Sequence, residues 1–144
     1  MDATSPTPVA TYGRDPKIAH SVHEKLLPDY EVVHACFDID SALSELPAIC
    51  AGELETTPSS GVGANSTEAE ASKRRAPVAI FFGGAGIPED EFERITAAVR
   101  ERAPGVHFVR VQKRDVLAAG SFGPNPDVIA KIYRKKMAAL AAKA

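Results

Sequence analysis

The sequence predicts an α/β protein, a three-layer sandwich in which helices cover both faces of a parallel four-stranded sheet. Three observations predict it. Runs of β-forming residues alternate with helical segments, which is typical of parallel strands joined by right-handed crossovers. The run PVAIFFGG at residues 77–84 is apolar throughout, as expected of a strand covered on both faces. The chain has 144 residues, enough for one domain with its own core, and we expect a single domain over 1–144.

The first strand is expected at residues 9–12, after a leader at residues 1–7 that is rich in Ser, Thr and Pro and is predicted to be flexible. A helix should follow, because Asp15 can cap it and Pro16 suits the first helical position. Pro28 should end it. Its apolar side chains recur every four residues and comprise Ile18, Val22 and Leu26.

A second strand is predicted at residues 30–37, where YEVVHACF is rich in β-forming residues. The segment DIDSALSELPAICAG then indicates a helix, with Asp38 available as a cap and Pro47 as a kink or a stop. The apolar side of this helix comprises Ile39, Ala42, Leu43, Leu46 and Ile49. Cys36 and Cys50 fall in these apolar segments, and we interpret both as buried, reduced thiols.

The composition changes at residues 53–76, which contain almost no large apolar side chains and many Ser, Thr, Gly and Glu. Such a segment cannot bury enough apolar surface to offset the entropy that it would lose on ordering. We therefore predict a flexible polar insertion between the second helix and the third strand. Its basic triplet Lys73-Arg74-Arg75 is interpreted as a solvated run of charge.

The last part of the chain predicts strand, helix, strand and two further helical segments. The helix after the glycines has Pro88 at its first position, acids in its first turn and arginines in its last, an arrangement that suits the helix dipole. VHFVRV at residues 106–111 is the fourth strand. A short helical turn capped by Asp115 and a long C-terminal helix capped by Asn125 complete the chain.

This order of elements predicts the sheet order 2-1-3-4, with strands numbered along the chain, in a reduced flavodoxin-like or receiver-like (Rossmann-like) sheet. In such sheets ligands bind beyond the carboxyl ends of the strands, at the point where the strand order reverses. The segments that follow the four strands should meet at this rim. Their ligand-binding candidates are Tyr12, Gly13, Arg14, Asp15, Asp38, Gly83, Gly84, Gly86, Lys113, Arg114 and Asp115.

The stretch FFGGAGIPEDEFERI resembles the start of a nucleotide site, because glycines join a strand to a helix there. Pro88, however, removes a backbone N–H donor, and the acids Glu89, Asp90 and Glu91 place negative charge where a phosphate would lie. The spacing also lacks the last glycine of the dinucleotide fingerprint. We therefore interpret the stretch as a structural turn and expect no cofactor.

Comparison with known families of this architecture leaves the function open. Receiver domains need a phosphoacceptor Asp after the third strand, where this chain has glycines, and YGRDP does not match the Ser- and Thr-rich flavin loop of flavodoxins. EKLLPDYEVVHACFDIDSALSELP followed by GGAGI resembles the substrate domain of 2-hydroxyacid dehydrogenases, which implies a flavodoxin-like fold. The coenzyme domain and the catalytic His and Arg context of that family do not occur in this sequence, so no residue role is carried over.

Candidate metal ligands and nucleophiles are interpreted as structural. His20, His23 and Glu24 lie close together on the first helix and have the chemistry of metal ligands, but we expect an exposed polar face. His34 and His107 are interpreted as packed or edge histidines, and Ser121 has no evident base. The sequence therefore names no catalytic residue and predicts no metal site.

The charge balance excludes two classes of partner. The formal net charge is −2 and the pI is near 6.1, so no field of one sign would attract nucleic acid or an anionic membrane. No apolar run approaches the ~20 residues of a membrane span, and the N-terminus lacks the features of a signal peptide. We therefore expect a cytoplasmic protein.

Two functional hypotheses remain, and whether the chain is an enzyme stays open between them. The first is a binding or protein-interaction module that forms a homodimer through a free sheet edge or its apolar C-terminal helix. The second is a small-molecule enzyme that acts on an anionic metabolite at the rim. Arg14, Lys113 or Arg114 would then bind the substrate and Asp15 or Asp115 would act as acid or base, although both aspartates also suit helix caps.

Overall fold

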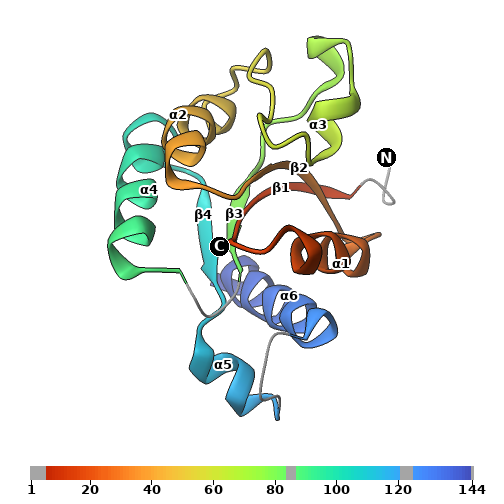
Figure 1. Cartoon of the computed structure of the whole chain (residues 1–144), viewed down its shortest axis with the longest axis vertical. Coiled ribbons are helices and arrows are strands. Elements are labelled where there is room, and N and C mark those ends of the chain that lie inside the picture. Colours follow the sequence, from red (N-terminus) through yellow and green to blue (C-terminus); the bar gives the residue numbers. More distant parts are fainter. Residues whose placement is uncertain (1–5, 84–86, 121–124, 144) are drawn as a thin grey trace.

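A four-stranded parallel sheet in the order β2-β1-β3-β4 lies at the centre of the structure (Figure 1). The computed structural model describes residues 6–83, 87–120 and 125–143, with the backbone alone for 141–143. The strands are β1 (Thr7–Tyr12), β2 (Tyr30–Cys36), β3 (Ala79–Phe82) and β4 (His107–Arg110). The strand order and the parallel pairing confirm the predicted fold class and are consistent with a flavodoxin-like arrangement.

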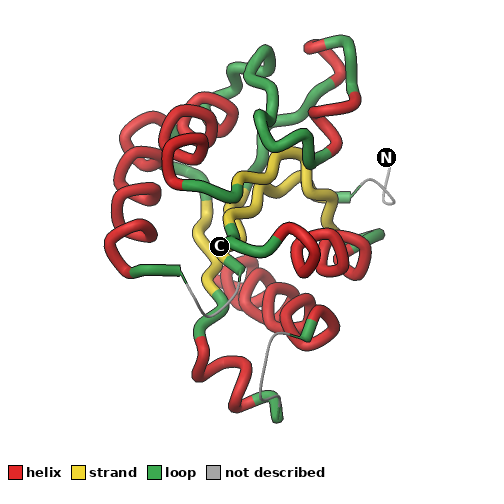
Figure 2. Tube along the Cα trace, in the orientation of Figure 1, coloured by secondary structure: helices red, strands yellow, loops and turns green. Residues whose placement is uncertain are grey.

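Helices cover both faces of the sheet, as Figures 1 and 2 show. The helices α1 (Pro16–Leu26) and α6 (Pro126–Lys143) pack against each other on one face, and α2 (Ile39–Cys50) and α4 (Glu89–Arg102) pack against each other on the other. The short helix α5 (Lys113–Ala118) joins β4 to α6. Within the described part of the chain, no helix has the length and apolar character that crossing a membrane requires.

Each face of the sheet has its own apolar core. The α1 and α6 side buries Val9, Val22, Leu26, Phe81, Ile129 and Tyr133. The α2 and α4 side buries Ala10, Leu46, Ile49, Ile80, Ile95 and Val99. Neighbouring residues of a strand belong to opposite cores, because successive side chains of a strand point to opposite faces. The predicted alternation of strands and helices is therefore realised as two layers of helix around one sheet.

Most helix starts follow the predicted capping. Asp15 Oδ1 accepts a hydrogen bond from the backbone N–H of Lys17 at 2.9 Å, and Asp38 Oδ1 accepts one from Ser41 at 2.8 Å. Asn125 Oδ1 accepts from the N–H of Asp127 at 3.0 Å. These side chains replace partners that the first helical turn lacks within the helix.

Several boundaries differ from the prediction, and β1 begins at Thr7, the last residue of the predicted leader. Asp115 does not begin α5: Gln112 is its N-cap, and the Asp115 carboxylate accepts a hydrogen bond from the Gln112 N–H at 2.8 Å. Pro88 is the N-cap of α4 and not its first residue. Pro47, which the sequence left as a kink or a stop, does not stop α2. The helix continues to Cys50, because the turn after the proline, including Ile49, is buried and its packing outweighs one missing hydrogen bond.

Polar contacts attach the segment 53–76 to the domain, and it contains the short helix α3 (Ala64–Thr67) and the 3₁₀ turn η1 (Ala71–Lys73). The Arg75 guanidinium pairs with Glu31 of β2 at 2.6 Å, and within the segment the buried Asn65 amide donates to the backbone O of Arg75 at 3.0 Å. Arg74 and Arg75 are partly buried, so the basic triplet is not the uniformly solvated run that the sequence predicts. The flexibility of the segment stays a prediction.

Both edges of the sheet are partly covered. At β2 the Ala35 N–H donates to the backbone O of Val62 at 3.1 Å, and Ser60 Oγ donates to the backbone O of Ala35 at 2.6 Å. At β4 the Lys136 ammonium donates to the backbone O of Arg110 at 2.6 Å. Such contacts protect exposed strands from pairing with other chains.

Candidate functional site

At the predicted rim between β1 and β3, side chains at the end of β1 and just after it pair with a side chain of the helix that follows β3. The buried Tyr12 hydroxyl, at the end of β1, donates to Glu91 Oε1 at 2.7 Å, and the Arg14 guanidinium forms an ion pair with Glu91 Oε2. Glu91 lies in the first turn of α4, the helix that follows β3. The segments after β1 and β3 therefore meet as predicted, and an internal ion pair joins them.

The pKa values of these groups shift away from neutral pH. Hydrogen bonds from Arg14 and then from Tyr12 hold the pKa of the Glu91 carboxyl below its usual range. Burial, reinforced by the neighbouring Glu91 carboxylate, raises the pKa of the Tyr12 hydroxyl. At neutral pH the carboxyl stays ionised and the phenol stays protonated. Neither group is suited to exchange a proton with a substrate near neutral pH.

The rim glycines Gly13 and Gly83 have structural roles in the backbone. The Gly83 N–H donates to the backbone O of Tyr12 at 2.9 Å, and the Gly13 N–H donates to that of Cys36 at 3.3 Å, so both extend the strand pairing. Gly83 also lies against Tyr133, whose hydroxyl would be 2.5 Å from a Cβ at this position. The close approach explains the glycine here. Gly84 and Gly86 lie outside the described residues.

Among the remaining rim candidates, the acidic side chains accept hydrogen bonds from other groups of the chain, and the basic side chains are exposed. Asp15 and Asp38 are exposed helix caps. Asp115 accepts a hydrogen bond from the Lys136 ammonium at 2.8 Å. Burial alone would raise the pKa of Asp115, but this contact and the Gln112 N–H outweigh it and lower the pKa. Lys113 and Arg114 are exposed and form no ion pair within the described part of the chain.

A second rim ion pair was not predicted from the sequence. Arg110, the last residue of β4, pairs with Glu89 at 2.8 Å, and its guanidinium lies 4.4 Å from the centre of the Phe92 ring. The sequence contained a signal for this ion pair, because Arg110 falls near the end of the predicted fourth strand and Glu89 falls in the first turn of a predicted helix. Both positions lie at the carboxyl edge of a parallel sheet.

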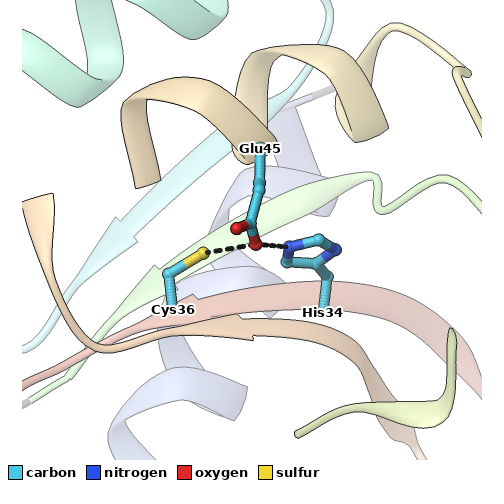
Figure 3. Close-up of side chains that lie close together, drawn as sticks. All are labelled: His34, Cys36 and Glu45. Atoms are coloured by element: carbon cyan, nitrogen blue, oxygen red, sulfur yellow. Dashed lines mark hydrogen bonds and ion pairs between the residues drawn. The ribbon is translucent and has the colours of Figure 1, made fainter. Parts of the chain in front are cut away.

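A second cluster lies beneath α2, where the sequence predicts no site (Figure 3). Glu45 extends from α2 toward β2, and its Oε1 atom lies 2.8 Å from His34 Nε2 and 3.8 Å from Cys36 Sγ. The Ser59 N–H donates to the same oxygen at 3.2 Å. His34 and Cys36 are fully buried, whereas the Glu45 side chain is 13% exposed. The candidate ligand atoms of the three side chains lie within 4.8 Å of one another.

An irregularity in β2 sets the face of the sheet on which the two strand residues of this cluster lie. Val9 of β1 pairs with Val32, but Ala10 pairs with His34, so Val33 is an extra residue in β2. Val32 consequently belongs to the core on the α1 side, and Cys36 belongs to the core on the α2 side. Bulges of this kind redirect side chains and are common next to functional sites.

The sequence contained a signal for this cluster. Residues two apart on a strand share a face, which relates His34 to Cys36. Glu45 lies three residues after Ala42, at the flank of the predicted inward side of the helix. The interpretation as a packed histidine and a buried thiol considered these residues one at a time, and so it missed their meeting.

The imidazole and the thiol of the cluster are both held in their neutral forms. Burial lowers the pKa of the His34 imidazole, although the Glu45 carboxylate opposes the shift. Burial and then the Glu45 charge raise the pKa of the Cys36 thiol. Burial raises the pKa of Cys50 to about 12. Neither thiol is activated as a nucleophile in this state, since activation requires a lowered pKa.

Comparisons with known proteins add one partial similarity. No family model matches this chain, and no solved structure matches it. Kojic acid related protein 6 from Aspergillus oryzae is 36% identical to this chain over 91 residues. These residues are 63% of this chain and 49% of that protein, so the chain spans about half the length of the curated relative.

The histidines of α1 differ in environment from each other. His20 and Glu24 are exposed, as predicted, but His23 is only partly exposed, and its Nε2 atom lies 3.2 Å from Thr11 Oγ1. Burial, together with the neighbouring His20, lowers the pKa of His23 from 6.5 to about 4. The prediction of an exposed face is therefore wrong for His23.

His23 should make the fold less stable in acid. The pKa of His23 is lower in the folded chain than in the unfolded chain. Between pH 6.5 and about 4 the unfolded chain therefore binds more protons, and the free energy of unfolding decreases as the pH falls through that window. We expect His23→Gln to remove up to about 3 kcal/mol of this loss. Urea unfolding at the two ends of the window measures it, with the exposed His107→Gln as control. An equal loss in wild type and His23→Gln would contradict the assignment.

Proposed function

We propose that this chain is a binding module that acts as a homo-oligomer in the cytoplasm, and that it does not catalyse acid–base chemistry at the rim. The observation that carries this proposal is the pairing of the rim carboxylates within the chain. Glu91 is bonded to Tyr12 and Arg14, Glu89 to Arg110. A general acid or base needs a group that is free to exchange a proton near the working pH.

The homo-oligomer would form through helix surfaces. Contacts from Val62 and Lys136 already cover parts of the two sheet edges, which makes continuation of the sheet into a second copy unfavourable. On α5 the side chain of Leu117 is half exposed, which supports a helical contact in this region. A cytoplasmic location agrees with Cys36 and Cys50 both being free thiols.

Sedimentation velocity over a wide range of protein concentration tests the oligomer. We expect a dimer or larger species at micromolar concentration, and Leu117→Asp should shift it toward monomer by placing a charge in the apolar contact. Val78→Asp is a matched control, because Val78 is also exposed but lies before β3, away from α5. A wild-type protein that is monomeric throughout would remove the homo-oligomer from the proposal.

An enzyme acting on an anionic metabolite is the second candidate, and the exposed cations support it. Lys113 and Arg114 are exposed, and the Arg14 side chain is 51% exposed despite its pair with Glu91. These three cations follow strands β1 and β4 at one edge of the sheet. They have the chemistry to bind a carboxylate or a phosphate.

A ligand and turnover screen separates the two candidates. The panel contains anionic metabolites and, because of the name of the relative, kojic acid. We expect no turnover, and for any ligand that binds at the rim we expect Arg14→Ala/Arg114→Ala to weaken binding roughly tenfold or more. Arg100→Ala/Arg102→Ala is the control, because it removes the same charge at the other end of α4. Turnover of a panel member that Arg14→Ala/Arg114→Ala abolishes would establish the enzyme instead.

A further inference from the structure

The cluster beneath α2 has the donor set of a transition-metal site. His34 supplies an imidazole nitrogen, Cys36 a sulfur and Glu45 a carboxylate oxygen, the three donor types that Zn²⁺ takes in proteins. Ligand atoms around tetrahedral Zn²⁺ lie roughly 3.3–3.7 Å apart, given bond lengths of about 2.0–2.3 Å. The observed Nε2–Oε1 and Sγ–Oε1 separations are 2.8 and 3.8 Å. We propose that these three side chains bind one Zn²⁺ or a similar borderline divalent cation.

The position of the ligands on β2 supports the proposal. A strand face that packs against a helix layer is ordinarily apolar, as the neighbouring strand shows with Ala10 and Tyr12 in the same core. β2 instead places His34 and Cys36 there, and both are fully buried. Buried polar groups are costly unless they are well paired. The contact of the Cys36 thiol with Glu45 is weak, at 3.8 Å, and a cation would give the sulfur a stronger partner.

The surroundings hold the ligands in place. The bulge at Val33 directs the strand residues toward α2, and the Ser59 N–H orients the Glu45 carboxylate. Ser60 and Val62 attach the same loop to the backbone of Ala35, between the two strand ligands. Partners outside the ligand set commonly orient the ligands of metal sites in this way.

The state of His34 permits coordination. Its Nδ1 atom is buried and has no partner among the residues that the structure describes. Nε2–H donates to Glu45 Oε1 at 2.8 Å, so coordination through Nε2 moves this ring proton to Nδ1 and leaves the Nε2 lone pair for a cation near Glu45. On binding, the Cys36 proton leaves to solvent as the metal–sulfur bond forms.

The types of the ligands indicate which ions the site would reject, and their number leaves one coordination position open. Mg²⁺ and Ca²⁺ prefer oxygen ligands, so a nitrogen and sulfur set disfavours them. Three protein ligands leave the fourth tetrahedral position for water or a small ligand. Glu45, the one cluster member with measurable exposure, marks the side from which the ion would enter. The proposal does not depend on the function of the rim.

Cobalt spectroscopy on the full chain, stripped of metal, tests the site without requiring a damaging mutation. Because the chain has two cysteines, Cys50→Ser leaves Cys36 as its single thiol. We expect wild type and Cys50→Ser to bind one Co²⁺ with an equally strong thiolate-to-cobalt charge-transfer band. Zn²⁺ should displace the cobalt and remove the band, whereas Mg²⁺ should not. Absence of the band in Cys50→Ser would overturn the proposal.

Ligand variants then test the set of three. Cys36→Ser should lose the band, and His34→Gln and Glu45→Gln should each weaken Zn²⁺ binding by more than the roughly 10–100-fold that loss of a partner outside the ligand set costs. Circular dichroism checks that each variant is folded. Ser44→Ala on α2 is the control, since its hydroxyl bonds to its own helix at the backbone O of Ser41. Unchanged affinity in folded His34→Gln and Glu45→Gln would show that these residues are not ligands.

Discussion

Gly83→Ala is expected to destabilise the fold by about 1–3 kcal/mol, the usual cost of overpacking a buried site. A Cβ at this position would lie 2.5 Å from the Tyr133 hydroxyl oxygen. The tyrosine cannot move away easily, because it is 2% exposed and its ring stacks on Phe81 with centroids 4.4 Å apart. The overlap must therefore displace either the end of β3 or the helix α6.

A second substitution should restore most of the stability that Gly83→Ala removes. Tyr133→Phe removes the clashing oxygen, and the next nearest atom to the added Cβ is then the ring carbon at 3.7 Å, an ordinary contact. Urea unfolding of Gly83→Ala, Tyr133→Phe and the double variant measures the coupling. Gly13→Ala is the control, since its Cβ would lie 3.7 Å from its nearest neighbour, the backbone O of Gly83. A Gly83→Ala loss of the same size in both backgrounds would contradict the proposed overlap.

Gly63→Ala should be the most damaging change in the segment 53–76, at about 3 kcal/mol. Gly63 has a φ of +119°, which side chains rarely adopt, and its Cβ would lie 2.5 Å from the backbone O of Val33. The backbone fixes the position of the Cβ, and its neighbour is a backbone atom, so no side-chain rotation relieves the overlap. We expect the loop at residues 59–63 to move away from the bulge in β2.

Two measurements separate this local effect from general loss of stability. Urea unfolding reports the total cost, and thiol labelling in a Cys50→Ser background reports exposure of Cys36, beside which the loop is attached. Gly61→Ala is the matched control, because its φ is +73° but its Cβ would meet no atom within 4 Å. Gly61→Ala should lower the free energy of unfolding by about 1 kcal/mol, because of the backbone conformation alone. Equal effects of Gly61→Ala and Gly63→Ala on stability and labelling would contradict a close contact with Val33.

Features set by near neighbours in the chain were predictable. The caps Asp15, Asp38 and Asn125 each bond to an N–H two or three residues ahead, so their signal is contained in a few letters. The apolar run that became β3 was recognisable because both of its faces are buried. The strand order followed from crossovers of one hand.

The features that the sequence left open or missed in α2 and in the segment 53–76 are decided by distant packing. α2 passes Pro47 because its last turn is buried against the second core. The polar segment 53–76 has few apolar side chains, and its contacts are polar and distant: Arg75 reaches Glu31, 44 positions away in the chain. Composition alone carries no record of such a partner.

The sequence by itself determined which segments outside 53–76 form strands and helices, and that their carboxyl edge is the place to search for a rim site. The tertiary structure alone decided which polar groups meet there. Tyr12 bonds to a carboxylate 79 positions away, and His34 reaches Glu45 through a bulge that shifts the register of β2. Periodicity indicates which face of an element a residue occupies. The meeting of two polar groups depends on how far apart the faces lie, and crossovers, bulges and helix packing set that distance.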